Sequence, residues 1–134
     1  MFETEEKIFT ERDLLLGILW EGDCQLHTNR PGMAKTPFGS TIVHGNSVTS
    51  MVLGRFLKHT LKVSKQFSLK ELEVNYLAPV HIGDLVKGFF VLENRNSFSH
   101  RQMLNLSFEI FKNKEVCVSK GTVLIEVDAE LNFE

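Results

Sequence analysis

The sequence has little cysteine, no excess of charge of either sign and no long apolar run. It holds 2 Cys and 3 Pro among 134 residues. Cys24 and Cys117 lie far apart and neither belongs to a Cys-x-x-Cys pair, so zinc-binding and dithiol redox motifs are not indicated. Two isolated cysteines are typical of a reduced, intracellular chain, and we expect a cytoplasmic protein.

The near balance of charge limits the classes of partner. Lys and Arg together number 15 and Asp and Glu 17, which gives a net charge of −2 at pH 7. Nucleic acids and anionic membranes both select clustered basic surfaces, so we expect neither as a partner. No apolar stretch is long enough to span a bilayer, and the acidic start, Met1–Glu6, differs from a signal peptide.

Signatures of bound cofactors are also missing from the sequence. There is no glycine-rich phosphate loop and no dinucleotide-binding fingerprint. His27 and His44, with one nearby aspartate, do not have a recognised metal-ligand spacing. We therefore expect neither a metal ion nor a cofactor.

The composition that remains is that of one ordinary domain. The hydrophobic fraction is 43% and the charged fraction is 24%, and both values are normal for a globular protein. A chain of 134 residues can bury a core without support from disulfides or metals. We expect a single domain over residues 1–134.

Helical spacing marks two segments in the first half of the chain. Thr10 is placed to cap a helix over residues 11–20, with acidic residues in its first turn. Residues 22–41 contain Pro and Gly without any period, which predicts a long loop of the kind often tied to function. The main helix is predicted over residues 45–62. One side of it carries small residues that would let a sheet approach closely: Ser47, Ser50 and Gly54.

From residue 67 the apolar period changes to two, which predicts strands. We expect four strands joined by short connections, over residues 67–77, 85–93, 101–111 and 115–127, after a short strand or loose arm at 1–9. A turn is predicted at Asn94–Ser97, and Gly121 is a candidate bulge. Short connections imply an antiparallel sheet, which together with the helices makes an α+β domain. Pairing with a second copy would cover an exposed edge of that sheet.

The stretch from 38 to 45 leads straight into the main helix and brings a histidine beside a glycine. The backbone N–H of Gly45, at a helix start, has the exposure and the positive helix end that can hold an oxyanion. His27 lies upstream, with Asp23 shortly before it. Because imidazole titrates near neutral pH, His27 and Asp23 together suggest an acid/base pair near that oxyanion donor.

Two motifs, in their order and separation, resemble a known family. The segment Ile42–Gly45 reads Ile-Val-His-Gly and opens the helix. The later segment Val74–Val80 reads Val-Asn-Tyr-Leu-Ala-Pro-Val and is followed by Ile82–Asp84, Ile-Gly-Asp. Over residues 10–127 the chain resembles the MaoC-like (R)-specific enoyl-CoA hydratases and 3-hydroxyacyl dehydratases of the hotdog fold.

This resemblance implies both a fold and a reaction. The fold is an α+β hotdog, in which an antiparallel sheet wraps around a long central helix. Two copies would pair into a homodimer with a continuous sheet, with an acyl thioester of coenzyme A or acyl carrier protein at their interface. The reaction would be reversible addition of water to a 2-enoyl thioester, giving the (R)-3-hydroxyacyl product without a redox or metal cofactor.

The family's catalytic motif reads Gly-Asp-x-Asn-Pro-hydrophobic-His, and the matching segment here, Gly22–His27, reads Gly-Asp-Cys-Gln-Leu-His. One residue is missing between Asp and His, and Asn-Pro is absent. The resemblance assigns Asp23 and His27 as the acid/base pair and Gly45 as the oxyanion donor. The candidate substrate-binding residues are His44, Asn46 and Ser50. Asn46 stands where the family usually has an apolar residue such as Met, and Ser50 could hydrogen-bond the carboxylate. The alternative role of His44 is to hold the loop or cap the helix.

Three alternatives stay open on the sequence. Glu21 is a second candidate for the carboxylate that works with His27. A thioesterase of the same fold would use a carboxylate to activate water against the thioester carbonyl carbon. A non-catalytic subunit that only binds acyl thioesters is favoured by the shortened spacing from Asp23 to His27.

Overall fold

The computed structural model describes residues 1–16, 43, 45–60 and 67–128. Among these residues, six strands make one sheet, and every pairing described in it is antiparallel. The strands are β1 (Phe2–Glu3), β2 (Lys7–Ile8), β3 (Ser68–Tyr76), β4 (Leu85–Phe98), β5 (Arg101–Lys112) and β6 (Val116–Asp128). Their order across the sheet is β1-β4-β5-β6-β3, and β2 also pairs with β4. The predicted antiparallel sheet is therefore confirmed.

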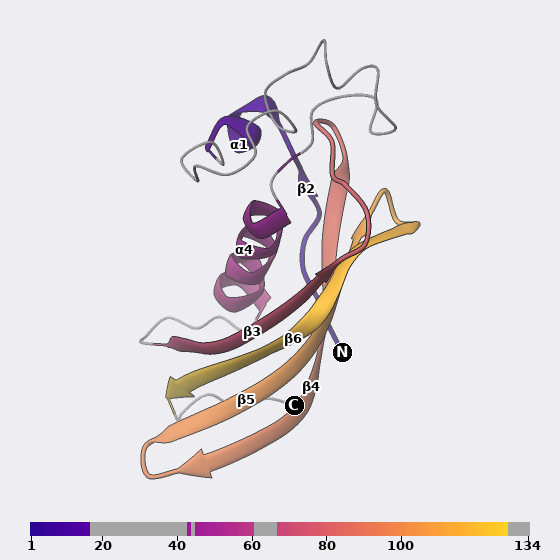
Figure 1. Ribbon diagram of the computed structural model, residues 1–134. Coiled ribbons are helices and arrows are strands. Elements are labelled where there is room, and N and C mark those ends of the chain that lie inside the picture. The colour runs from indigo at the N-terminus through magenta and orange to yellow at the C-terminus, as the bar shows by residue number, and fades with distance from the viewer. Residues whose placement is uncertain (17–42, 44, 61–66, 129–134) are drawn as a thin grey trace.

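One helix lies inside the curve of this sheet. The α-helix α4 (Gly45–Arg55) continues into a π-helical turn, η2 (Phe56–Thr60). Figure 1 shows the strands curving around α4, which confirms the expected α+β arrangement of a sheet wrapped around a central helix. The predicted helix over residues 45–62 changes its winding at Phe56, and residues 61 and 62 lie outside the described residues. None of the described helices has the length and apolar content needed to cross a bilayer.

A short helix, α1 (Glu11–Leu16), follows β2 where Thr10 was predicted to cap it. The Thr10 N–H donates to Asp13 Oδ2 at 2.9 Å, and the Thr10 hydroxyl lies 3.2 Å from the same oxygen. Lys7 Nζ lies 3.2 Å from that oxygen as well. An acceptor at the third helical position satisfies the donor at the cap, so one carboxylate both starts α1 and joins it to β2.

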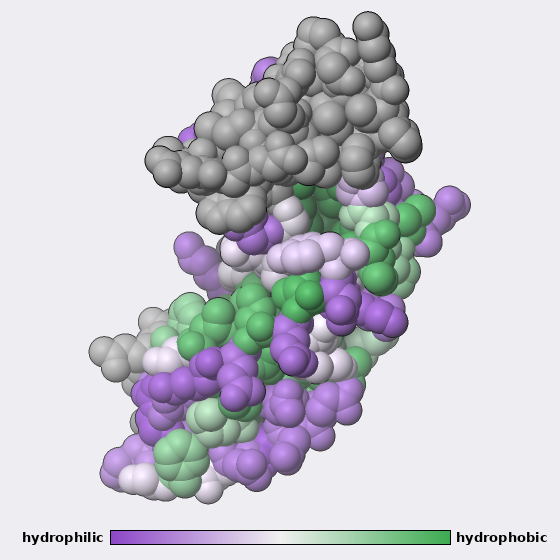
Figure 2. Space-filling view, viewed as in Figure 1, coloured by the Kyte–Doolittle hydropathy of each residue, from purple (hydrophilic) through white to green (hydrophobic). Residues whose placement is uncertain are grey.

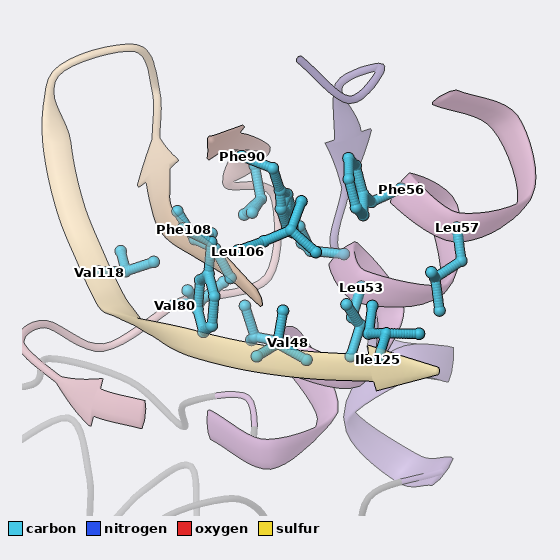
Figure 3. Close-up of a cluster of buried hydrophobic side chains, with 14 of the residues drawn as sticks. Val48, Leu53, Phe56, Leu57, Val80, Phe90, Leu106, Phe108, Val118 and Ile125 are labelled. Atoms are coloured by element: carbon cyan, nitrogen blue, oxygen red, sulfur yellow. The ribbon is translucent and has the colours of Figure 1, made fainter. Parts of the chain in front are cut away.

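The core fills the space between the concave face of the sheet and α4. The alternation predicted for β5 is confirmed, because all four apolar side chains of one face are buried: Leu104, Leu106, Phe108 and Ile110. Figure 3 shows side chains of α4 and η2, among them Val48 and Leu53, pointing toward this face. Phe56 of η2 stacks on Phe90 of β4 with ring centroids 3.9 Å apart. The π-turn therefore places an aromatic ring at the centre of the core.

The turn predicted at Asn94–Ser97 is wrong. These residues continue β4, which pairs with β5 from Asn94↔Asn105 to Phe98↔Arg101. The chain reverses just beyond the end of β4, at Ser99, whose φ is 51°. Asn and Ser favour turns through local hydrogen bonds, but here the pairing along the long hairpin outweighs that preference.

Gly121 is not a bulge, although the sequence made it a candidate. It keeps a regular register between Val74 of β3 and Phe108 of β5. A Cβ at this position would collide with the backbone carbonyl of Glu73. Glycine is thus needed here because the backbone of β3 comes too close for a side chain.

The small-residue stripe of the main helix does not face the sheet. Ser50 and Gly54 are exposed, and a Cβ added at Gly54 would meet nothing within 4 Å. The close approach comes from the other partner, because Gly88 of β4 packs directly against Val52 of α4. The sequence predicts that small residues of the helix allow the close approach. In the structure the residue that allows it is a glycine of the sheet, Gly88.

Candidate active site

The start of α4 is tied to the segment that connects β3 with β4. The Val43 N–H donates to the Val80 carbonyl oxygen at 2.7 Å. Both side chains are only 3% exposed and belong to the core. Because Gly45 comes two residues after Val43, this bond sets where the helix begins relative to the sheet.

Gly45 is the first residue of α4 and lies against the ring of Tyr76, the last residue of β3. A Cβ built on Gly45 would lie 2.6 Å from Tyr76 Cε1, which is closer than real side chains approach. A larger residue at this position would have to push the Tyr76 ring aside. Tyr76 is 57% exposed, so much of its side chain remains accessible beside the helix start.

The positive end of α4 is not neutralised by the helix itself. No residue of its first turn is acidic. Within the described part of the chain, the Gly45 N–H has no hydrogen-bond acceptor. A helix of 11 residues with such a start favours negative charge, so this point can bind an oxyanion or an anionic group.

A crevice too narrow to admit a water molecule lies between α4 and the concave face of the sheet. Side chains of both line it: Thr49, Leu53, Leu72, Phe90, Phe108 and Ile110. Thr49 is the one polar member, and its hydroxyl donates to the Gly45 carbonyl oxygen at 3.1 Å. Because that hydroxyl is satisfied within the helix, the crevice offers an apolar surface one turn from Gly45.

The described residues hold part of the predicted site. Asn46 is exposed, and its Oδ1 accepts a hydrogen bond from the Ser47 N–H at 3.0 Å. Ser50 is exposed on α4, and Gly45 lies at the helix start as expected. The other predicted site residues lie outside the described residues: Asp23, His27 and His44. The predicted loop over 22–41 lies outside them too, so the acid/base pair stays a prediction.

Asp84 closes the connection between β3 and β4. Its carboxylate accepts hydrogen bonds from the His81 N–H at 2.8 Å and from Asn113 Nδ2 at 3.0 Å. Lys112 Nζ lies 3.7 Å from Asp84 Oδ2. Burial by itself would raise the pKa of Asp84, but these donors and charges outweigh it and hold the pKa below its usual value of 3.8. Asp84 is therefore an anion at neutral pH.

Two contacts near the helix start could not be predicted from the sequence: that of Tyr76 with Gly45, and that of Lys112 with Asp84. The alternating pattern puts Tyr76 in a strand and Asp84 between two strands, and nothing in it indicates a role for Lys112. The only signal was that Tyr76 and Asp84 belong to the motif that carries the family resemblance. Among the described residues, no group of three or more His, Cys, Asp or Glu side chains is arranged to hold a metal ion.

Comparison with solved structures shows which fold this is. A monoamine oxidase regulatory protein from Archaeoglobus superposes with a TM-score of 0.82 at 23% identity, covering 95% of this chain and 87% of that one. The (R)-hydratase from A. caviae involved in PHA biosynthesis gives 0.79 at 21% identity, covering 93% of each chain. The (R)-hydratase PhaJ1 from Pseudomonas aeruginosa gives 0.76 at 19% identity, covering 98% and 85%. At these identities the likeness shows the fold, which is the hotdog fold.

Comparison by sequence reaches the family. A search of curated proteins finds no match. The family model described as "MaoC like domain" matches residues 5–109, which is most of the chain. This span includes the helix start at Gly45 and the Val74–Asp84 segment, on which the resemblance was based. The chain belongs to the MaoC-like domain family.

Proposed function

We propose that the protein is a hydratase/dehydratase that interconverts a 2-enoyl thioester and its (R)-3-hydroxyacyl thioester. The observation that carries the proposal is the start of α4, where the N–H of Gly45, without an acceptor among the described residues, lies at the positive end of a helix. In hydration, the oxygen of water bonds to C3 and a proton is added to C2, while negative charge develops on the thioester oxygen. A preorganised donor for that charge contributes roughly 2.7–4 kcal/mol of transition-state stabilisation.

The proposed roles follow the two halves of this reaction. The Gly45 N–H holds the thioester oxygen. His27 and Asp23 orient the water, accept its proton and deliver a proton to C2. Support for this pair comes from the sequence motif, in which Asp23 and His27 keep the residue types of the family.

The acyl chain of the substrate is proposed to enter the apolar crevice beside Thr49, whose walls would have to move apart to admit it. Its lining, including Leu53 and Phe108, has the apolar character that an alkyl chain needs. His44 and Asn46 flank Gly45 in the sequence and Ser50 follows on the next turn of α4, and these three remain the proposed contacts for the thioester and its carrier. The carrier is coenzyme A or acyl carrier protein.

We infer a homodimer formed along β3. Figure 2 shows hydrophobic side chains gathered along this part of the sheet, and β3 exposes three large ones: Leu69, Leu72 and Tyr76. No described strand pairs with the outer side of β3, and an unpaired edge of this length favours pairing with another strand. The single domain over residues 1–134 and the cytoplasmic location stay predictions.

The test is a spectrophotometric assay that follows loss of the enoyl absorbance with short and medium 2-enoyl-CoA and with the matching carrier-protein thioesters. Wild type should turn over, and His27→Ala and Asp23→Asn should lose at least a hundredfold in kcat. Gly45→Ala should also lose activity, since its methyl group would displace Tyr76. His100→Ala, at the exposed reversal between β4 and β5, is the control that should keep wild-type rates.

Two other outcomes would contradict the proposal. Release of free thiol from a saturated acyl thioester, without hydration of the enoyl form, would identify the thioesterase alternative. Binding of acyl thioesters with no turnover on either carrier would identify the non-catalytic subunit that the short Asp23-to-His27 spacing favours.

A further inference from the structure

The segment Pro79–Asp84, which we name the β3–β4 connection, is the element that holds the start of α4. Its Val80 carbonyl accepts the hydrogen bond from Val43, two residues before Gly45. A shift of this connection would therefore move the start of α4 and with it the Gly45 N–H. Two side chains, Lys112 and Asp84, hold the connection in place.

Lys112, the last residue of β5, reaches across to the connection. Its Nζ donates to the Pro79 carbonyl oxygen at 2.7 Å and lies 3.7 Å from Asp84 Oδ2. The Lys112 and Asp84 side chains are only 15% and 17% exposed. One ammonium group thus joins both ends of the connection to the sheet.

Asp84 adds hydrogen bonds of its own, and we call the contacts of Lys112 and Asp84 with the connection the brace. Its Oδ2 accepts from the His81 N–H within the connection, and its Oδ1 accepts from Asn113, the residue after Lys112. The N-terminal segment adds two backbone bonds, from the Gly83 N–H to the Phe9 carbonyl at 2.7 Å and from the Phe9 N–H to the Asp84 carbonyl at 3.1 Å. Hydrogen bonds from β5, from Asn113 and from the N-terminal segment therefore hold the connection that carries the Val80 carbonyl.

We propose that Lys112 and Asp84 are positioning residues that set the location of the Gly45 N–H through the bond from Val43 to Val80. The proposal rests on the function proposed above, in which that N–H stabilises the developing oxyanion. Neither side chain needs to touch the substrate. A donor displaced by about an ångström loses much of its effect on a transition state, so a loosened brace lowers the rate more than it weakens substrate binding.

The kinetic test compares two substitutions of Lys112 with a matched lysine elsewhere. Lys112→Met should lower kcat at least tenfold and change KM less than threefold, whereas Lys112→Arg, which keeps the charge and its donors, should recover most of kcat. The control is Lys87→Met, because Lys87 also forms an ion pair, 3.0 Å from Glu3, but its partner belongs to the N-terminal segment and not to the connection. It should leave kcat unchanged.

A second measurement reads the brace without any substrate. The Val43 N–H is bonded to Val80, so its hydrogen exchange in the intact protein reports whether the helix start is held. Lys112→Met should speed exchange at Val43 at least tenfold, while amides of the β5–β6 pairing, such as Leu106, exchange as in Lys87→Met. This comparison separates local loosening from general loss of stability.

The two measurements keep the two proposals distinguishable. If wild type turns over no thioester but Lys112→Met still releases the Val43 amide, the brace is supported and the hydratase function fails. If exchange at Val43 is unchanged, or rises only in step with the β5–β6 amides, Lys112 does not position the helix start. Equal loss of kcat in Lys112→Met and Lys112→Arg with unchanged exchange also overturns the proposal.

Discussion

The two edges of the sheet differ in whether another described strand pairs with the edge. At the β4 edge the chain's own N-terminal segment supplies β1 and β2. Between them Thr4, 3% exposed, donates its N–H to the Gly88 carbonyl and accepts the Gly88 N–H on its hydroxyl, both at 2.9 Å. At the β3 edge no described strand covers the outer side, and Leu69 and Leu72 remain exposed.

The difference follows the position of the candidate site. The open edge ends in Tyr76, whose ring lies against Gly45 at the start of α4. The closed edge meets the opposite part of α4, where Gly88 packs on Val52. Within the described residues, the chain covers the edge that borders the core, and no strand covers the edge that borders the proposed oxyanion donor. A second subunit pairing along β3 would then approach the site.

The largest loss of stability is expected where β3, the strand of the open edge, pairs with β6. In Gly121→Ala the new methyl group would collide with the Glu73 carbonyl of β3. Because backbone cannot move aside as a side chain does, we expect a loss of about 3 kcal/mol in the free energy of unfolding. Urea denaturation measures it.

Gly54→Ala is the matched control for this substitution. Gly54 is exposed on α4, and a Cβ there meets nothing within 4 Å. Alanine should stabilise that helix by roughly 0.5–1 kcal/mol. An unchanged stability in Gly121→Ala would show that β3 is not held close against β6, and the comparison of the two edges would lose its structural basis.

The second prediction concerns the closed edge. Thr4→Val keeps the shape of the side chain but removes the acceptor of the buried Gly88 N–H. An unsatisfied buried donor costs roughly 1–3 kcal/mol, so the free energy of unfolding should fall by about 2 kcal/mol.

Thr122→Val, at an exposed position of β6, should change the stability far less. The pair is compared by urea denaturation at the same protein concentration. A Thr4→Val protein as stable as wild type would mean that β1 and β2 rest on the sheet without contributing to it.

The third prediction tests the open edge by charge. Leu69→Lys places an ammonium group on β3 at a side chain that is 48% exposed in the single chain. We expect little change in the stability of one chain, but a dissociation constant of the dimer at least tenfold higher, measured by sedimentation equilibrium.

Val91→Lys supplies the matched control, because Val91 is 39% exposed on β4. It should leave the association unchanged. If both substitutions weaken the dimer equally, or neither does, subunits do not pair along β3 and the distinction between the edges has another cause.

Much of the fold could be predicted because it depends on periodic patterns. The alternation from Leu104 to Ile110 identifies the buried face of β5, and its four side chains are buried. The errors arose where a local preference competed with pairing across the sheet. Asn94–Ser97 has the composition of a turn, but the strand opposite satisfies its backbone and extends the hairpin. Such a partner is distant in sequence and leaves no local signal.

The candidate site shows the same division. Gly45 could be predicted because glycine, histidine and a helix start are adjacent in sequence. The contact of Gly45 with Tyr76, and of Lys112 with Pro79, joins segments about 30 residues apart, as the separation of 33 for Lys112 and Pro79 shows. These contacts depend on how the strands are ordered in the sheet, which periodicity does not determine.

The smallest predicted effect is a pH dependence at the β3–β4 connection, which links the two edges. The folded pKa of Asp84 is lowered from 3.8, because the donors at His81, Asn113 and Lys112 outweigh the effect of burial. A lowered folded pKa contributes stability above the unfolded value, and this contribution is lost as pH falls through the folded value. Asp84→Asn should therefore be less stable than wild type at neutral pH, by under about 1 kcal/mol. Urea denaturation from about pH 7 down to about pH 3 should show this difference shrinking only below 3.8. A difference that stays constant over the whole range would mean that the ionised carboxylate does not hold the connection.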